Sequence, residues 1–120
     1  MQIGEFMAKN DVKMMVIACN TISATCIDEL RIKYPDKPII SAISPTARVV
    51  AENCNAEENI GILATKATIK SGAYEDKIKK KNKTLNNLFP MACPAFVPLI
   101  EEGIIDNEIM DLTIKYYLDD

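Results

Sequence analysis

The chain has 120 residues, of which 48% are hydrophobic and 26% charged, and its formal net charge is −3. This balance is typical of a folded globular protein, and its acidic charge argues against nucleic acid as the main partner, which would require a basic surface. The sequence contains no apolar run of membrane-spanning length, and its first residues do not resemble a signal peptide. We therefore expect a cytoplasmic protein without a membrane partner.

Strand-like and helix-like segments alternate along the chain. Apolar runs that predict strands cover residues 12–18, 38–43, 59–64 and 88–92, the last interrupted by Pro90. Patterns that predict helices cover residues 2–10, 21–33, 45–53 with Ser44 as cap, 67 into the 70s, 74–83, 95–103 and 106–118. This alternation predicts an α/β fold, a parallel sheet with flanking helices. Three or four strands are few for a sheet covered on both faces, so we interpret the chain as a piece of a longer protein.

Cysteine usage and the absence of histidine restrict the possible chemistry. The four cysteines, Cys19, Cys26, Cys54 and Cys93, form no C-x-x-C pair, and the sequence has no histidine. A metal site and disulfides are therefore not expected, and Ser-His or Cys-His catalysis is excluded. Cys26 and Cys54 fall in helical patterns and are expected in the core. Acid–base chemistry near neutral pH is left to Cys, Asp, Glu, Lys or Tyr side chains.

The segment Val16-Ile17-Ala18-Cys19-Asn20-Thr21 is the first candidate site. An apolar strand stops at Cys19, and a helical pattern follows. Open α/β sheets bind ligands at this edge, and the first N–H groups of a helix favour a thiolate and bound carboxylates. The competing interpretation is a small buried residue followed by an ordinary helix cap, and the spacing alone favours it.

Thr65 and Thr68 repeat this logic after the third strand. They lie three residues apart at a helix start, so both hydroxyls are able to face one anionic group. The alternative is that Thr65 is a plain N-cap, which is the more common case.

Glu101 is the candidate in the segment that begins at Cys93-Pro94. It lies four residues after Val97, so the two share a helix face that is partly apolar and able to enter a cleft. Pattern alone favours a solvated glutamate near the glycine stop at Gly103. The basic run over residues 77–83 is interpreted as a solvated helix face.

In this order, three motifs resemble glutamate racemase, within the aspartate/glutamate racemase superfamily. They are Val16-Ile17-Ala18-Cys19-Asn20-Thr21, then Leu63-Ala64-Thr65-Lys66-Ala67-Thr68-Ile69-Lys70-Ser71-Gly72-Ala73-Tyr74, then Cys93-Pro94-Ala95-Phe96-Val97-Pro98-Leu99-Ile100-Glu101-Glu102-Gly103. The resemblance implies a cofactor-independent interconversion of L- and D-glutamate for peptidoglycan synthesis. It also implies two similar α/β lobes with the site between them.

The resemblance also assigns roles to individual residues. Cys19 matches the first of two catalytic cysteines, which act as base and acid on opposite faces of the substrate Cα. Asn20 and Thr21 match residues that bind the amino-acid end of the substrate. Thr65 and Thr68 match cleft threonines, and Glu101 matches a glutamate near the site.

Departures from the family pattern suggest incomplete lobes. The family's Asp-Ser-Gly segment does not precede Met1, and its second cysteine lies in a Gly-Cys-Thr-His motif that a chain without histidine lacks. We expect residues 1–44 to form part of one lobe and 45–120 part of the other, as an internal fragment that is inactive alone. Two alternatives stay open, namely an aspartate racemase-type enzyme and a non-catalytic remnant that binds acidic amino acids. The expected partners are glutamate and either a second copy or a complementing fragment.

Overall fold

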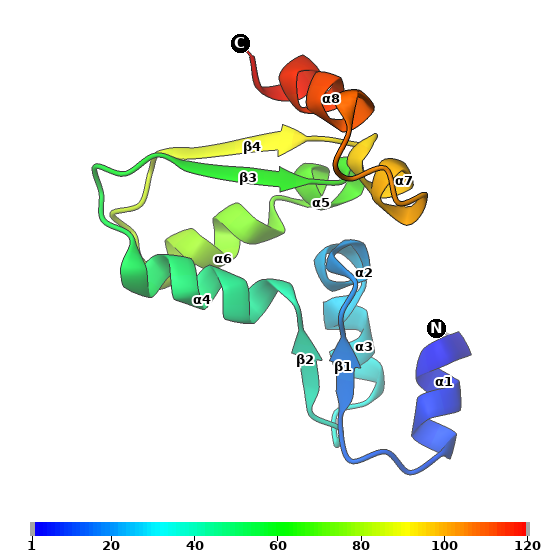
Figure 1. The fold of residues 1–120 in the computed structure, drawn as a ribbon. Coiled ribbons are helices and arrows are strands. Elements are labelled where there is room, and N and C mark those ends of the chain that lie inside the picture. The colour runs from blue at the N-terminus through cyan, green and yellow to red at the C-terminus, as the bar shows by residue number, and fades with distance from the viewer. Residues whose placement is uncertain (1, 120) are drawn as a thin grey trace.

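The strands form two separate parallel pairs in the computed structural model, which describes residues 2–119. Strand β1 (Met15–Ile17) pairs with β2 (Ile39–Ser41), and β3 (Ile60–Ala64) pairs with β4 (Leu88–Ala92). The helices between and around them are α1 (Gln2–Lys9), α2 (Asn20–Thr25), α3 (Ile27–Lys33), α4 (Ile43–Asn53), α5 (Lys66–Ser71), α6 (Ala73–Lys81), α7 (Phe96–Glu101) and α8 (Glu108–Leu118). The expected α/β class with parallel strands and flanking helices is confirmed (Figure 1).

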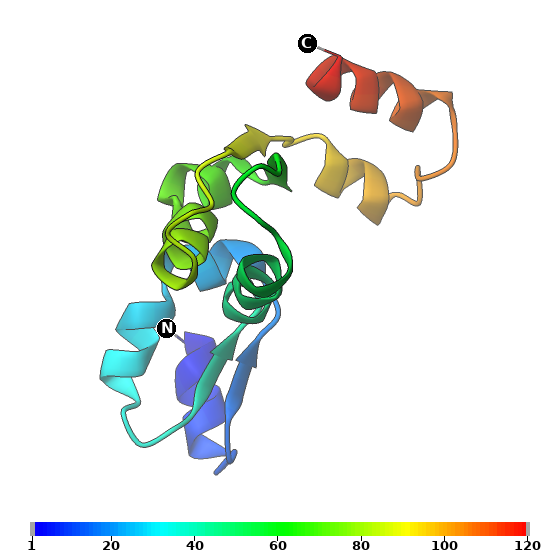
Figure 2. The same ribbon diagram turned by 90° about the vertical axis from the view of Figure 1, so that its left-hand side faces the viewer.

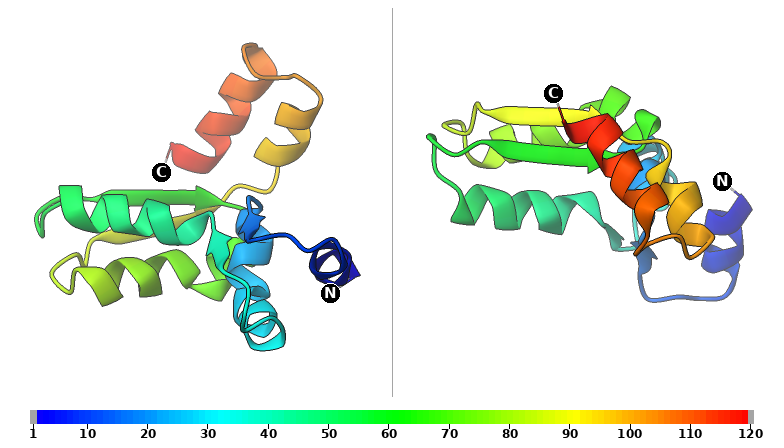
Figure 3. Two further views of the ribbon diagram at one scale, coloured as in Figure 1. Left: turned by 90° about the horizontal axis from the view of Figure 1, so that it is seen from below. Right: turned by 45° about the horizontal axis from the view of Figure 1, so that its top comes forward.

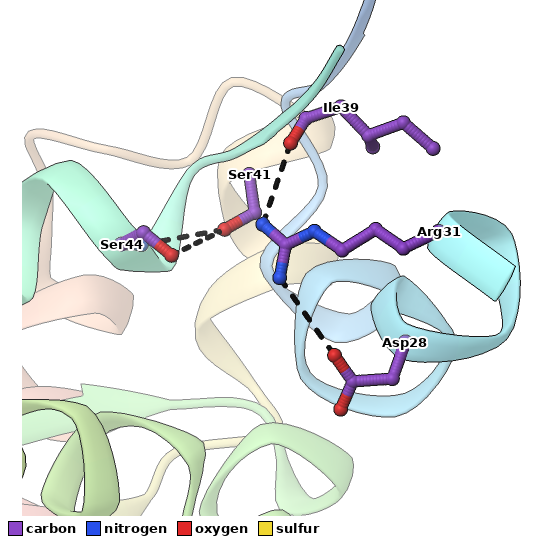
Figure 4. Close-up of polar contacts among 5 residues, drawn as sticks. All are labelled: Asp28, Arg31, Ile39, Ser41 and Ser44. Carbon is purple, nitrogen blue, oxygen red and sulfur yellow. Dashed lines mark hydrogen bonds and ion pairs between the residues drawn. The ribbon is translucent and has the colours of Figure 1, made fainter. Parts of the chain in front are cut away.

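The first pair of strands has its own hydrophobic core. Its buried members come from β1, α3 and β2, and they are Met15, Ile27, Leu30 and Ile39. Helix α1 packs against this cluster through Met7 and Ala8, and the Nζ atom of Lys33 lies 2.6 Å from Oε1 of Glu5. Helix α3 is also hydrogen-bonded to β2, because Nη2 of Arg31 donates to the carbonyl oxygen of Ile39 at 3.3 Å (Figure 4).

The second pair of strands has a second core. Its buried members come from α4, β3, α6 and the loop before β4, and they are Ala47, Ile62, Ile78 and Leu85. Helices α4 and α6 lie side by side, and Figure 3, left, looks onto them with β3 and β4 behind. Two cores are consistent with a division into two lobes, although α4 crosses from one strand pair to the other (Figure 1). The boundary at 44/45 stays a prediction.

Helices α7 and α8 project from the end of β4 (Figure 2). They are joined by an edge-on contact between the rings of Phe96 and Tyr117, whose centroids lie 5.4 Å apart. The hydroxyl of Tyr117 also accepts a hydrogen bond from the backbone N–H of Ala95 at 3.2 Å.

Each strand pair leaves apolar side chains on one face in solvent. Val16 and Ile40 are register partners in the first sheet, and they are exposed by 62% and 43%. In the second sheet the exposed side chains are Leu63, Phe89 and Met91. Parallel sheets are ordinarily covered on both faces, so these surfaces are unusual for the class.

The start of α4 corrects the expected cap at Ser44. The helix begins at Ile43, so Ser44 lies inside its first turn. The side chain that accepts there is Ser41, whose Oγ atom takes the N–H of Ser44 at 3.3 Å and lies 3.1 Å from the Ser44 hydroxyl (Figure 4). Pro45 fits two residues into the helix because the first N–H groups have no intrahelical partner.

The predicted helix over 21–33 is also wrong in one respect, because it is broken at Cys26. That residue has φ −126° and ψ 0°, and it ends α2 and precedes α3. Cys26 and Cys54 are both half-buried rather than in the core, although Cys54 packs against the second cluster. Pro90 does not interrupt β4, because a strand in a two-stranded sheet always has one free edge.

Candidate functional site

Cys19 lies where β1 gives way to α2. It is the N-cap of α2 with extended backbone, φ −80° and ψ 118°, and its side chain makes no capping hydrogen bond. Ser23, which is 1% exposed, donates its hydroxyl to the carbonyl oxygen of Ile17 at 3.2 Å and so ties the first turn of α2 to the strand end. Of the four cysteines Cys19 is the exposed one, so its thiol is free for chemistry.

The two residues after Cys19 contact the part of the molecule that contains the second strand pair and its core. The Oγ1 atoms of Thr21 and Thr65 lie 3.1 Å apart, and the Tyr74 hydroxyl donates to Oδ1 of Asn20 at 3.1 Å. Both contacts join residues more than forty positions apart in sequence. The structure therefore brings Thr21 into contact with Thr65 and Asn20 into contact with Tyr74, while the substrate-binding roles of Asn20, Thr21 and Thr65 stay predictions.

Thr65 is the N-cap of α5. Its backbone is extended, and its Oγ1 atom accepts the N–H of Thr68 at 3.4 Å and lies 3.1 Å from the Thr68 hydroxyl. The simple capping interpretation of Thr65 is thus confirmed, and its hydroxyl also contacts Thr21. Thr68 is 1% exposed, so the hydroxyl that contacts Thr65 lies in the protein interior.

Two open cavities lie on either side of this junction. The first, about 430 Å³, takes its polar lining from Asn20, Thr46, Thr65, Thr68, Tyr74 and Cys93. The second, about 580 Å³, is lined by Cys19 together with apolar residues of α1, β1 and α3. Both volumes fall in the usual range of small-molecule sites. Cys19 and Asn20 are adjacent in sequence, so the strand exit contributes one residue to each cavity.

The chemistry of this junction is that of neutral donors beside a thiol. Among the residues that the structure describes, none with a charged side chain lines the first cavity, while Glu29 is the charged residue of the second. Hydroxyl and amide groups are able to donate to a carboxylate, and a thiol is able to exchange a proton with a bound molecule. Over residues 2–119 no three His, Cys, Asp or Glu side chains are grouped to hold a metal ion.

Cys93 reaches the first cavity in a different state from Cys19. It is 2% exposed, and burial raises the pKa of its thiol. Its backbone N–H donates to the carbonyl oxygen of Ala64 at 2.9 Å, which continues the pairing of β3 and β4. Cys93 therefore stays a protonated, enclosed thiol. Its position on the cavity was missed in the sequence, as was that of Tyr74.

Glu101 does not join this group. It is the last residue of α7, it is exposed, and it lines neither cavity. Val97 and Ile100 of the same helix do line the first cavity. The helix face predicted for Val97 therefore reaches the site, whereas its carboxylate neighbour points into solvent.

The part of the chain between Gln2 and Asp119 contains no helix with the length and hydropathy needed to cross a bilayer.

An open parallel-strand edge that holds an exposed cysteine and a cluster of hydroxyls defines an α/β protein with a candidate acid–base site. Residues 2–108 match the family described as Asp/Glu/Hydantoin racemase, and the chain belongs to that family. The glutamate racemase of Sulfurihydrogenibium sp. is 46% identical over 110 residues, which are 92% of this chain and 41% of the relative. That of Persephonella marina is 38% identical over the whole chain and 45% of its own length.

Solved structures agree with this assignment. Glutamate racemase from Francisella tularensis in complex with D-glutamate superposes with a TM-score of 0.90 at 37% identity, over 98% of this chain and 43% of that one. The Campylobacter jejuni enzyme gives a TM-score of 0.91 at 30% identity, over 99% and 47%. The chain thus spans less than half the length of the relatives that it matches.

Proposed function

We propose that these residues form one half of the active site of a cofactor-independent glutamate racemase, with Cys19 as one of its two acid–base groups. The observation that carries the proposal is the exposed Cys19 thiol at the strand exit, directly before Asn20, which lines the first cavity together with Thr65. The relatives support glutamate as the substrate, since those named above are glutamate racemases and one holds D-glutamate.

In the proposed reaction, the Cys19 thiolate takes the proton from the substrate Cα. The C–H electron pair stays on the substrate as a carbanion, and Cys19 becomes a neutral thiol. A second acid then delivers a proton to the opposite face of Cα, which inverts the centre. In the reverse direction Cys19 gives its proton back.

The neutral donors of the site have the complementary task. The Asn20 amide and the Thr65 hydroxyl, which both line the first cavity, hold the amino-acid end of glutamate, and the hydroxyls of Thr21 and Thr68 support Thr65. Glu101, which the resemblance places near the site, takes no part in this proposal because its carboxylate is exposed outside both cavities.

The 120 residues by themselves supply one accessible thiol at this site. Cys93 is enclosed with a raised pKa, so it is unsuited to exchange protons with a substrate. We therefore propose that the 120-residue polypeptide binds glutamate without racemising it. The complementing fragment expected from the sequence would supply the second acid.

Both parts of the proposal are tested on the purified 120-residue polypeptide. L- and D-glutamate are titrated while the amide resonances of Asn20 and Thr65 are followed by NMR, with aspartate as the competing ligand. We expect saturable shifts at both residues and stronger binding of glutamate than of aspartate. Preferred binding of aspartate would favour an aspartate racemase-type enzyme, and a lack of any shift would reject the proposed site.

A second assay follows the chemistry in heavy water with a Cys19→Ala control. We expect no D-glutamate from L-glutamate above that control. Deuterium at Cα without inversion would show that the Cys19 half-reaction survives. Formation of D-glutamate by the wild-type polypeptide would contradict the one-thiol argument.

A further inference from the structure

One contact at the site has no counterpart among the residues assigned by the resemblance. Tyr74 donates its hydroxyl proton to Oδ1 of Asn20, and the oxygen atoms lie 3.1 Å apart. Among the described residues, Tyr74 is the only one whose side chain is hydrogen-bonded to the side chain of Asn20. It crosses from the half that contains the second core to the residue next to Cys19.

The Tyr74 ring is fixed independently of this contact. It packs against the second core, while its hydroxyl reaches the wall of the cavity that Asn20 also lines. The chain reaches Tyr74 through Gly72, whose φ of 66° permits the sharp turn from α5 into α6. A ring held on the core presents its hydroxyl at a defined position.

A primary amide has two different ends, and the partner of one end decides what the other can do. The oxygen accepts hydrogen bonds, while the NH₂ group donates two. A carboxylate ligand requires the NH₂ end. When the Tyr74 proton engages Oδ1, the amide cannot turn its oxygen toward the ligand without losing that bond.

We propose that Tyr74 is a positioning residue that orients the Asn20 amide, so that its NH₂ group faces the carboxylate of a bound amino acid. Tyr74 does not touch the reacting atoms, and its action passes through Asn20. Tyr74 packs against the second core, whereas Asn20 is the first residue of α2, which follows β1 of the first strand pair. The orientation of the amide therefore also depends on how the two strand pairs with their cores are placed. The inference rests on the proposed function, since it takes an amino acid as the ligand.

The test compares Tyr74→Phe with Tyr117→Phe in the 120-residue polypeptide. Each change removes one hydroxyl and keeps the ring, and the Tyr117 hydroxyl bonds to the backbone of Ala95 rather than to Asn20. The first readout is the pair of Asn20 side-chain NH₂ resonances without ligand. The second is the affinity for L-glutamate from an NMR titration.

We expect Tyr74→Phe to move the Asn20 NH₂ resonances and to weaken glutamate binding about 3- to 10-fold, the range for one neutral hydrogen bond. Tyr117→Phe should leave both readouts at wild-type values. Circular dichroism of each variant verifies that the fold is kept.

Each other outcome overturns the inference. Unchanged NH₂ resonances in Tyr74→Phe would show that the hydroxyl does not orient the amide. Wild-type affinity in Tyr74→Phe, or an equal loss in Tyr117→Phe, would reject the positioning role and leave the proposed function in place. A wild-type polypeptide that binds no glutamate would reject the proposed function and the inference together, and this titration identifies that case without any variant.

Discussion

The Oγ1 atoms of Thr21 and Thr65 lie 3.1 Å apart and join the first turn of α2 to the N-cap of α5. The two residues have different local duties. Thr65 also caps α5 by accepting the N–H of Thr68, whereas the Thr21 hydroxyl makes only the long-range contact to Thr65. One hydroxyl therefore combines local and long-range stabilisation, and the other provides only the long-range part.

Substituting these residues should separate the two contributions. Thr65→Ala should lower the free energy of unfolding by about 1 kcal/mol or somewhat more, because it removes a helix cap together with the contact to Thr21. Thr21→Ala should cost less, about 0.5 to 1 kcal/mol, because only one hydrogen bond is lost. Urea unfolding followed by circular dichroism measures both.

Thr113→Ala is the matched control for this pair. The Thr113 hydroxyl donates to the carbonyl oxygen of Ile109 within α8, and alanine is a better helix former. We expect no loss of stability there. If Thr113→Ala lowers the free energy of unfolding as much as Thr65→Ala does, the α5 cap and the Thr21–Thr65 contact contribute nothing specific to stability.

Thiol reactivity should differ sharply between Cys19 and Cys93. The thiolate is the reactive form, so exposure and a low pKa both favour alkylation. Cys19 is exposed, whereas Cys93 is 2% exposed and burial raises the pKa of its thiol. With iodoacetamide at neutral pH, peptide mass spectrometry should find Cys19 modified first and Cys93 last.

Unfolding provides the control for this difference. In concentrated urea both thiols are exposed, and their rates should converge. If Cys93 reacts as fast as Cys19 in the native protein, the enclosed environment described here is incorrect.

The sequence predicts the order of elements better than their junctions. All four strands and the Thr65 cap leave local patterns and are predicted correctly in order, but the first two strands are shorter than predicted, Met15–Ile17 instead of 12–18 and Ile39–Ser41 instead of 38–43. The break at Cys26 has no glycine or proline to mark it, so a helical pattern continues through it. At α4, the hydroxyl of Ser41 takes the accepting role predicted for Ser44, because the helix begins two residues before Pro45.

The candidate site shows the same limit more strongly. Cys19, Thr21 and Thr65 were recognisable from strand exits and from the family resemblance. The Tyr74–Asn20 bond joins residues 54 positions apart, and no periodic pattern reports such a contact. For Glu101 the pattern identified the helix correctly, but the fact that Val97 and Ile100 line the cavity, while Glu101 does not, depends on how α7 meets the second sheet.

The ion pair between Glu5 and Lys33 should make the docking of α1 dependent on pH. The hydrogen bond from Lys33 lowers the pKa of Glu5 below its ordinary value of 4.5, and the same bond raises the pKa of Lys33 above 10.5. The Glu5 contribution is complete above pH 4.5 and is lost as pH falls through the lower, folded-state pKa. The Lys33 contribution is complete below pH 10.5 and is lost as pH rises through its higher folded-state pKa.

Comparison with Glu5→Gln isolates this pair from the other titrating groups. The difference in urea midpoint between wild type and Glu5→Gln should be constant near neutral pH and shrink below pH 4.5. Added salt should also reduce it, because both side chains are solvent-exposed. A difference that does not change with pH would show that the pair is not formed in solution.

Substitution of Gly72 should destabilise the protein more than substitution of Gly61. Its φ of 66° lies in the left-handed region, and an added Cβ would meet nothing closer than Asp76 Oδ2 at 3.9 Å. Gly72→Ala should therefore cost about 1 kcal/mol from backbone strain alone, without a steric clash. Gly72→Asn should recover part of that loss, because asparagine tolerates this conformation better than alanine.

Gly61 lies in β3 with open space around an added Cβ, so Gly61→Ala should be neutral or slightly stabilising. Urea midpoints of the three variants measure these effects, and equal stability of the two alanine variants would contradict the assigned turn between α5 and α6.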